Sequence, residues 1–234
     1  MKIKFITLTC EKYHNTRVDT IRKTWGANKD IWFLSDMNVG DDIIGYDYLQ
    51  SGYENIWMKY SELLKKTTSY EYDWYFFTDD DTFVNMNRIN ELLEKYSNND
   101  PICIGHVGLL NSDGKDMDGN DTGFPTHTIN GKDVSLPLYY VSGGAGFILS
   151  KKSMNLICDY MRSLENYQIP RSYNGDVTFG FWMRNSEIKV IDVLGFWWTN
   201  PKELNHDKSK IETSYTYHYI NEIDMKKIYL SYEC

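Results

Sequence analysis

Short apolar runs bounded by polar residues recur along the chain and predict the strands of a buried sheet. Residues Lys2–Thr9 form the first run, and the four consecutive aromatic residues Trp74–Phe77 form the most apolar one. Unbroken apolar runs of this length are typical of strands that are covered on both faces. The remaining predicted strands are Ile31–Leu34, Ile43–Leu49, Ile102–Gly105, Tyr139–Val141, Gly146–Leu149 and Ile188–Val193.

Apolar positions between these runs recur at the spacing of a helix. In Asn15–Trp25 the residues Val18, Ile21 and Trp25 share one face, and Gly26 fits the C-terminal end. The other predicted helices are Glu54–Ser69, Asn87–Tyr96, Lys151–Leu164 and Asp176–Arg184. Strands that alternate with helices in this way predict an α/β layered fold with a mostly parallel sheet.

One long segment breaks this pattern. Asn, Asp and Gly dominate Leu110–Ser135, which predicts a long loop or an irregular hairpin, and loops of this length in compact domains are usually functional. No Pro-, Gly- or Ser-rich stretch is long enough to be a linker, so residues 1–234 are expected to form a single domain.

Charge and cysteine usage narrow the classes of partner. The net charge of −8 argues against a nucleic acid or an anionic membrane held by charge alone, so no nucleic-acid partner is expected. The four cysteines lie far apart and form neither a disulfide framework nor a zinc framework. The N-terminal apolar run is too short to span a membrane, and it is interpreted as the first strand.

The strongest local signal is the run of three acids, Asp79–Asp81, that follows the aromatic strand. Ligands bind at the carboxyl ends of strands in open α/β sheets, and adjacent carboxylates there need a cation to offset their repulsion. Because side chains at i and i+2 of an extended segment point the same way, Asp79 and Asp81 are expected to face one site. Carboxylate oxygens favour hard divalent ions such as Mg²⁺ or Mn²⁺. The alternative is a solvated acidic turn that caps the helix starting near Asn85.

Three further segments carry candidate chemistry, each with a structural alternative. The small residues around Gly143 and Gly144 would let a ligand approach the backbone closely, but a bulge or a tight bend explains them equally well. Asp176 is either a cap or first-turn residue of its helix, or a general base across the pocket from the metal. His218 is either a packed histidine among tyrosines, or an additional ligand that would favour Mn²⁺.

Taken in order along the chain, these segments resemble the fringe and core 1 β1,3-galactosyltransferase group, glycosyltransferase family 31. The resemblance implies a GT-A type, Rossmann-like α/β/α sandwich. It also implies an inverting, Mn²⁺-dependent hexosyltransferase, with Mg²⁺ as the alternative metal. The donor would be a UDP-sugar, and a hexose or N-acetylhexosamine would pass to a glycan or glycoprotein acceptor through a β1,3-type linkage. The matching segments are Thr16–Trp25, Trp57–Lys59, Asp73–Val84, Val141–Ser150, Asp176–Gly180 and Tyr215–Ile220.

The resemblance also implies a role for each acidic candidate. Asp81 would be the main metal carboxylate, and Asp79 and His218 would complete the protein ligands. Asp79 and Asp80 would also hold the ribose of the donor. Asp176 would deprotonate the acceptor hydroxyl.

The remaining candidates would contact the nucleotide, the donor sugar or the acceptor. Gly143 and Gly144 would lie against the donor sugar. Arg17 and Lys59 are cationic candidates near the nucleotide, and a surface charge on a helix is the alternative for each. Trp197 and Trp198 could form an acceptor platform, because aromatic faces cover the CH groups of sugars, or these rings could equally belong to the core.

The sequence leaves two cellular locations and three functional classes open. Animal members of the group are anchored Golgi proteins, so we expect a cytoplasmic protein if Met1 is the true start and the Golgi lumen if an anchor was trimmed. A metal-dependent phosphate hydrolase could use the same acids, but it would need more carboxylates or histidines than one cluster supplies. A non-catalytic, degenerate sugar-binding transferase is the third reading, and the intact set Asp79–Asp81, Asp176 and His218 counts against it.

Overall fold

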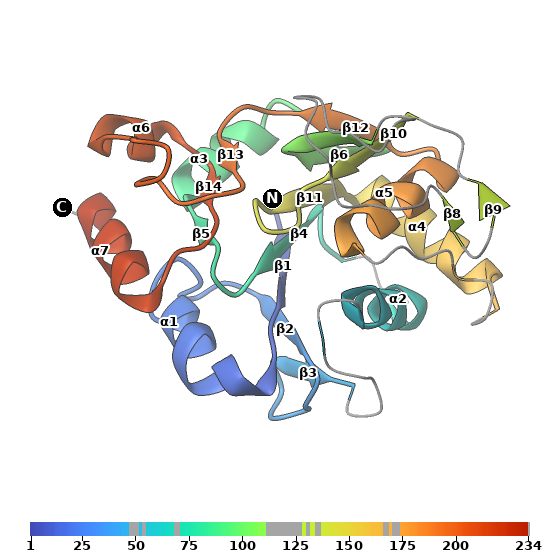
Figure 1. The fold of residues 1–234 in the computed structure, drawn as a ribbon, viewed down its shortest axis with the longest axis horizontal. Helices are drawn as coiled ribbons and strands as arrows, with labels where there is room; N and C mark the ends of the chain where they lie inside the picture. The colour runs from blue at the N-terminus through green and yellow to red at the C-terminus, as the bar shows by residue number, and fades with distance from the viewer. Residues whose placement is uncertain are drawn as a thin grey trace.

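Among the described residues, a seven-stranded sheet runs through the middle of the computed structural model (Figure 1). The structure describes residues 1–46, 52, 55–67, 71–110, 128–129, 132–133, 137–165, 169 and 174–233. The strand order is β12-β6-β11-β4-β1-β2-β3, and every strand except β11 points the same way. The predicted mostly parallel sheet is therefore confirmed. The strands are β1 (Ile3–Leu8), β2 (Ile31–Ser35), β3 (Ile43–Gly45), β4 (Trp74–Asp79), β6 (Ile102–Gly105), β11 (Phe147–Ser150) and β12 (Lys189–Asp192).

Helices cover both faces of this sheet, which gives the predicted α/β/α layering (Figure 1). The aromatic strand β4 accounts for this arrangement, because its side chains alternate between the two cores. Tyr75 and Phe77 pack under the first set of helices, and Trp74 and Phe76 pack under the second. A strand buried on both faces needs an unbroken apolar run, which is what the sequence supplies. The first set is α2 (Ile56–Lys66), α4 (Lys151–Ser163) and α5 (Gly175–Asn185), and the second is α1 (Asp19–Arg22), α3 (Met86–Leu93) and α7 (Glu222–Glu233).

Smaller strand groups accompany the central sheet in the described part of the chain. The strand β5 (Phe83–Val84) follows β4 and pairs with β14 (Thr216–Tyr217), which also pairs with β13 (Phe196–Trp197). This small sheet brings the late part of the chain, including the helix α6 (Lys208–Thr213), next to the residues that follow β4. Two antiparallel pairs complete the fold, β7 (Val107–Leu110) with β10 (Leu138–Val141), and β8 (Thr128–Ile129) with β9 (Lys132–Asp133).

The helix predicted over Asn15–Trp25 differs most from the observed structure. The chain turns earlier, through η1 (Glu11–Tyr13) and the π-helical turn η2 (His14–Val18), before α1, which ends at Arg22. The wider turn lets His14 reach the end of β2, where its Nε2 lies 2.7 Å from Ser35 Oγ. Helical turns of this kind are frequent at functional sites, and this one also carries Arg17.

Several other predicted boundaries are shifted or fall partly outside the described residues. The helix α2 is shorter than the predicted Glu54–Ser69, and residues 54, 68 and 69 lie outside the described part. Residues 47–49 of the predicted strand Ile43–Leu49 lie outside it as well. Within the predicted loop Leu110–Ser135 the structure describes the end of β7 and the pair β8–β9. In the part of the chain that the structure describes, no helix is long and apolar enough to cross a bilayer.

Replacing Phe77 with alanine should strongly destabilise this fold. The ring is fully buried, stacks on Phe147 at 4.9 Å and contacts Phe179 and Tyr60 at 5.5 and 5.7 Å. We expect the free energy of unfolding to fall by about 3–5 kcal/mol, measured by urea denaturation. As a control, Leu230→Ala on the exposed side of α7 should change it by less than about 0.5 kcal/mol. A loss of under about 1 kcal/mol for Phe77→Ala would contradict the burial of this face of β4 under α2, α4 and α5.

Candidate active site

The three predicted acids lie at the carboxyl edge of the central sheet. Asp79 is the last residue of β4, and a turn closed by the Thr82 N–H to the Asp79 carbonyl at 3.2 Å carries Asp80 and Asp81. The turn is not solvated, because the Asp80 and Asp81 side chains are only 6% and 13% exposed. It does not cap the next helix either, since Asn85 caps α3. The alternative of a solvated capping turn is therefore wrong.

His218 lies beside two of these acids. Its Nε2 is 3.1 Å from Asp81 Oδ1 and 3.6 Å from Asp79 Oδ2, and one ligand atom from each of the three residues falls within 4.8 Å of the others. The histidine follows β14, and two backbone hydrogen bonds fix its segment. The His218 N–H donates to the Trp197 carbonyl, and the Ile220 N–H donates to the Asp81 carbonyl. The structure thus brings the three predicted metal ligands together.

The orientation of the His218 ring suits a metal ligand. Its Nδ1 lies 3.2 Å from the Trp198 carbonyl oxygen, which can only accept a hydrogen bond, so Nδ1 carries the proton. Nε2 is then the atom that faces the carboxylates. Metal-binding histidines are oriented in this way, with the second ring nitrogen donating to a carbonyl or a carboxylate.

The charges at this edge also favour a cation. Burial raises the pKa of Asp79 to about 7, and the charges of Asp81, Asp176 and Asp80 add to the rise although His218 opposes it. Burial acts in the same direction on Asp81, but the hydrogen bond and charge of His218 outweigh it, so the pKa of Asp81 is lowered. Two carboxylates and one imidazole form a donor set that fits Mn²⁺, and Mg²⁺ less well because of the nitrogen ligand.

Asp80 has a different environment from its neighbours. Thr9 Oγ1 donates to its Oδ2 at 2.6 Å, and Arg17 Nη1 donates to its Oδ1 at 2.7 Å. The same Arg17 nitrogen lies 3.1 Å from Asp81 Oδ2, and its guanidinium lies over the Tyr13 ring at 4.0 Å. Asp80 and Arg17 therefore tie β1 and the π-helical turn to the acidic run, next to the three candidate ligands.

Lys59 lies on the other side of this network. It projects from α2, is 7% exposed and donates from Nζ to the Thr9 carbonyl at 3.0 Å. Burial lowers its pKa, although the charges of Asp36, Cys10 and Asp80 oppose the change. The alternative of a surface charge on a helix is therefore wrong for Lys59, and for Arg17 it does not fit a paired side chain that is 27% exposed.

The diglycine segment is a tight turn that lets two side chains approach the backbone. The Gly146 N–H donates to the Gly143 carbonyl at 2.9 Å, and Thr82 Oγ1 donates to the Gly144 carbonyl at 2.8 Å. A Cβ on Gly144 would lie 2.1 Å from His218 Cε1, and a Cβ on Gly143 would lie 2.6 Å from an Asp176 oxygen. Both contacts are too short for any side chain. The two glycines are therefore required for His218 and Asp176 to reach the same place.

Asp176 enters this site from the first turn of α5. The cap of that helix is Asn174, whose Oδ1 accepts from the Asp176 and Val177 N–H groups at 2.7 and 3.4 Å, so Asp176 is a first-turn residue and not the cap. Burial raises the pKa of Asp176 to about 6, against the effects of a backbone hydrogen bond from Gly143 and the charge of His218. A carboxylate with this pKa is ionised at neutral pH and still able to accept a proton.

The structure adds residues that the sequence did not single out. Thr9 and Asp36 follow β1 and β2 at the same edge, and the position of both strand ends is the only signal that could have indicated them. Asp36 Oδ1 accepts from the Glu11 N–H at 2.8 Å. The two tryptophans that the sequence could not distinguish have different environments. Trp197 donates from Nε1 to Ser214 Oγ and packs on His206, whereas Trp198 is 53% exposed next to His218.

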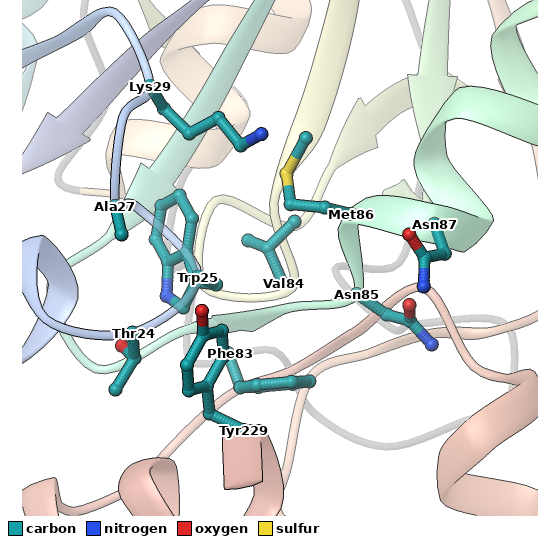
Figure 2. Close-up of a pocket in the computed structure, with 10 residues that line it drawn as sticks. All are labelled: Thr24, Trp25, Ala27, Lys29, Phe83, Val84, Asn85, Met86, Asn87 and Tyr229. Atoms are coloured by element: carbon teal, nitrogen blue, oxygen red, sulfur yellow. The ribbon is translucent and has the colours of Figure 1, made fainter. Parts of the chain in front are cut away.

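A cavity of about 220 Å³ is lined in part by both residues of β5 (Figure 2). Trp25, Phe83 and Tyr229 contribute aromatic walls, and Lys29 and Asn87 contribute polar groups at its margin. None of the predicted site residues lines it. The candidate active site is therefore the edge that holds the carboxylates, and this cavity is separate from it.

Comparisons with known proteins agree with the resemblance noted in the sequence. The sequence model of one protein family, described as Fringe-like, matches residues 2–233. A mouse beta-1,3-glucosyltransferase is 22% identical over 96% of this chain and 42% of its own length. A Drosophila melanogaster Fringe glycosyltransferase is 28% identical over 61% of this chain and 35% of its own length. The chain thus spans less than half the length of these relatives.

Solved structures of similar shape are also found. One is the galactosyltransferase LgtC in complex with donor and acceptor sugar analogs, at a TM-score of 0.48 and 11% identity over 97% of this chain and 95% of that chain. Another is mouse xyloside xylosyltransferase 1 in its apo form, at a TM-score of 0.43 and 11% identity over 93% and 97% of the two chains.

Gly144→Ala should disrupt the metal site without unfolding the protein. The added Cβ would overlap the imidazole, so His218 has to rotate away from Asp79 and Asp81. We expect Mn²⁺ affinity to fall by about 10–100-fold, measured by the paramagnetic resonance signal of free Mn²⁺, with an unchanged circular dichroism spectrum. Ser142→Ala in the same turn is the control and should bind as wild type does. Full affinity in Gly144→Ala would show that His218 does not hold the metal.

Proposed function

Because the chain belongs to the Fringe-like family, we propose that it is a metal-dependent, inverting glycosyltransferase. It transfers a hexose or N-acetylhexosamine from a UDP-sugar to a glycan or glycoprotein acceptor, through a β1,3-type linkage like that in the name of the mouse relative. The observation that carries the proposal is the convergence of Asp79, Asp81 and His218 with Asp176 on one diglycine turn. The observed α/β/α layers and the family match together confirm the predicted GT-A type α/β fold.

The acidic run and His218 would bind the nucleotide-sugar donor through a metal ion. A Mn²⁺ or Mg²⁺ ion bound by Asp79, Asp81 and His218 would neutralise the charge that grows on the departing diphosphate. Arg17 adds a fixed positive charge beside Asp80 and Asp81, and the buried Lys59 adds another on the far side of Thr9. These cations lower the negative charge that an anionic nucleotide would meet at this edge, in a chain whose net charge is −8.

Asp176 supplies the proton acceptor. An inverting transfer needs one base on the side of the sugar opposite the leaving group, positioned against the attacking hydroxyl. Asp176 and His218 lie against consecutive glycines, so the base and the metal ligand are neighbours that reach the site from different elements. Trp198 is exposed and its backbone carbonyl contacts His218, so its ring is our candidate for the surface on which the acceptor sugar packs.

The two other classes have less support. A phosphate hydrolase of the two-metal type needs a second cluster of ligands, and Asp79, Asp81 and His218 form the one group of that kind found among the described residues. A degenerate binding module would have no need for a carboxylate that lies against the same diglycine turn as the metal ligand His218. Asp176 is such a carboxylate.

Binding of UDP should depend on a divalent cation. Calorimetric titration with UDP should give heat of binding with MnCl₂ present and none after chelation, because the diphosphate meets the carboxylates only through the metal. His218→Ala should weaken Mn²⁺ affinity by about 10–100-fold, whereas His206→Ala, which removes a histidine bonded to Tyr217, should not. Metal-independent binding of UDP would contradict the assignment of the acidic run.

Asp176→Asn should abolish transfer and preserve UDP affinity, since an amide cannot accept the proton of the acceptor hydroxyl. We expect a loss of about 10²–10⁴-fold in rate with a donor found by screening UDP-sugars for thermal stabilisation. Because the pKa of Asp176 is raised to about 6, wild-type kcat/KM should decline as the pH falls through about 6, where the base becomes protonated. Asp192→Asn at the same edge is the control. Retained transfer in Asp176→Asn, or a rate that stays level well below pH 6, would remove Asp176 as the base.

A further inference from the structure

Tyr219 adopts a backbone conformation that its residue type disfavours. Its φ is +54°, in the left-handed region, where bulky side chains clash with the backbone and glycine or asparagine is normally found. Its side chain is 60% exposed, so burial of apolar surface does not account for the choice of an aromatic residue. Strained residues of this kind cluster at functional sites, which makes the contacts of this ring informative.

The turn at Tyr219 is fixed on both sides. The preceding residue donates its N–H to the Trp197 carbonyl at 3.0 Å, and the following residue donates its N–H to the Asp81 carbonyl at 2.9 Å. The left-handed residue therefore joins the small sheet to the acidic run. A glycine would make this connection at lower cost in free energy, so the turn alone does not explain a tyrosine.

The tyrosine ring lies on the imidazole of His218. The two ring centroids are 3.8 Å apart and the planes differ by 22°, which is a stacked arrangement between adjacent residues. Adjacent side chains of an extended strand point to opposite faces, so the left-handed φ is what permits this contact. His218 is also held at Cε1 and Nδ1 by the close approach of Gly144 and by the Trp198 carbonyl.

From these contacts we infer that Tyr219 is a positioning residue, which acts by holding the imidazole of His218 so that Nε2 faces Asp79 and Asp81. This inference rests on the proposed function, because it concerns the same metal site. The ring restricts rotation of the imidazole before any ion arrives. The metal then meets ligands that are already oriented, and less conformational freedom is lost on binding.

Three substitutions separate the ring from the backbone turn. Tyr219→Gly and Tyr219→Asn both tolerate a left-handed φ and remove the ring, whereas Tyr219→Phe keeps it. We expect Mn²⁺ affinity, measured by titration with UDP present, to fall by about 10-fold or more in the first two and to match wild type in the third. Glu187→Gly, at another exposed left-handed position (φ +55°) that follows α5, is the matched control and should leave the affinity unchanged.

A second measurement does not require the metal. In nitrogen-15 spectra of the metal-free protein, the His218 ring of wild type and Tyr219→Phe should give sharp signals with Nδ1 protonated, and Tyr219→Gly should give exchange-broadened ones. The thermal midpoint of the metal-free Tyr219→Gly protein should equal or exceed that of wild type, because the strain is relieved. If Tyr219→Gly does not fold, Tyr219→Asn decides the question by the same two measurements.

Two outcomes would overturn the inference. Wild-type affinity and sharp His218 signals in Tyr219→Gly would show that the ring does not position the histidine. Loss of affinity in Tyr219→Phe would assign the effect to the hydroxyl group instead of the stacked ring. If wild type itself binds no Mn²⁺, the proposed function fails, and the metal-free spectra still decide whether Tyr219 orders His218.

Discussion

Repulsion between carboxylates at one edge of the sheet is the constraint on which this site depends. Asp79, Asp80, Asp81 and Asp176 lie close enough for their charges to affect one another, and burial makes each charge more costly. The protein offsets part of this cost with fixed partners. Arg17 and Thr9 satisfy Asp80, and His218 satisfies Asp81. The repulsion that remains is concentrated at Asp79, which is where a cation would relieve it most.

The surrounding fold explains how chemically different groups reach that edge from distant parts of the sequence. Parallel strands deliver their carboxyl ends to one side, which accounts for Thr9 and Asp79. His218 arrives by a different route, through a strand of the small sheet that pairs with β5 directly after the acidic run. Asp176 comes from a helix start. The glycines at 143 and 144 allow the last two to meet, so their lack of side chains is as much a part of the site as the charged groups.

Much of this arrangement can be predicted from the sequence, and the reasons for failure elsewhere are physical. The aromatic run Trp74–Phe77 predicts a central strand because only two-sided burial favours four adjacent rings. The acids that follow it are predicted to lie at the carboxyl edge by the same argument. The π-helical turn at His14–Val18 could not be predicted, because it depends on bonds to Ser35 and Asp80, which are remote in sequence. Nor could the sequence separate Trp197 from Trp198, since packing on His206 decides which ring is covered. The two hydrogen bonds that Asp80 accepts from Thr9 and Arg17 could not be predicted either. The sequence does not distinguish three adjacent acids, because their partners are remote along the chain.

The reversed direction of β11 has a consequence for how the protein can vary. Because β11 runs against β4 and β6, the chain departs from the sheet after Gly105 and returns at Phe147 on the same side. Because this excursion begins and ends at one edge, the part of it before the diglycine turn can lengthen, shorten or change its composition without altering strand register anywhere in the central sheet. The segment between β6 and the diglycine turn can therefore diverge between relatives, while the groups that would perform the transfer keep their places.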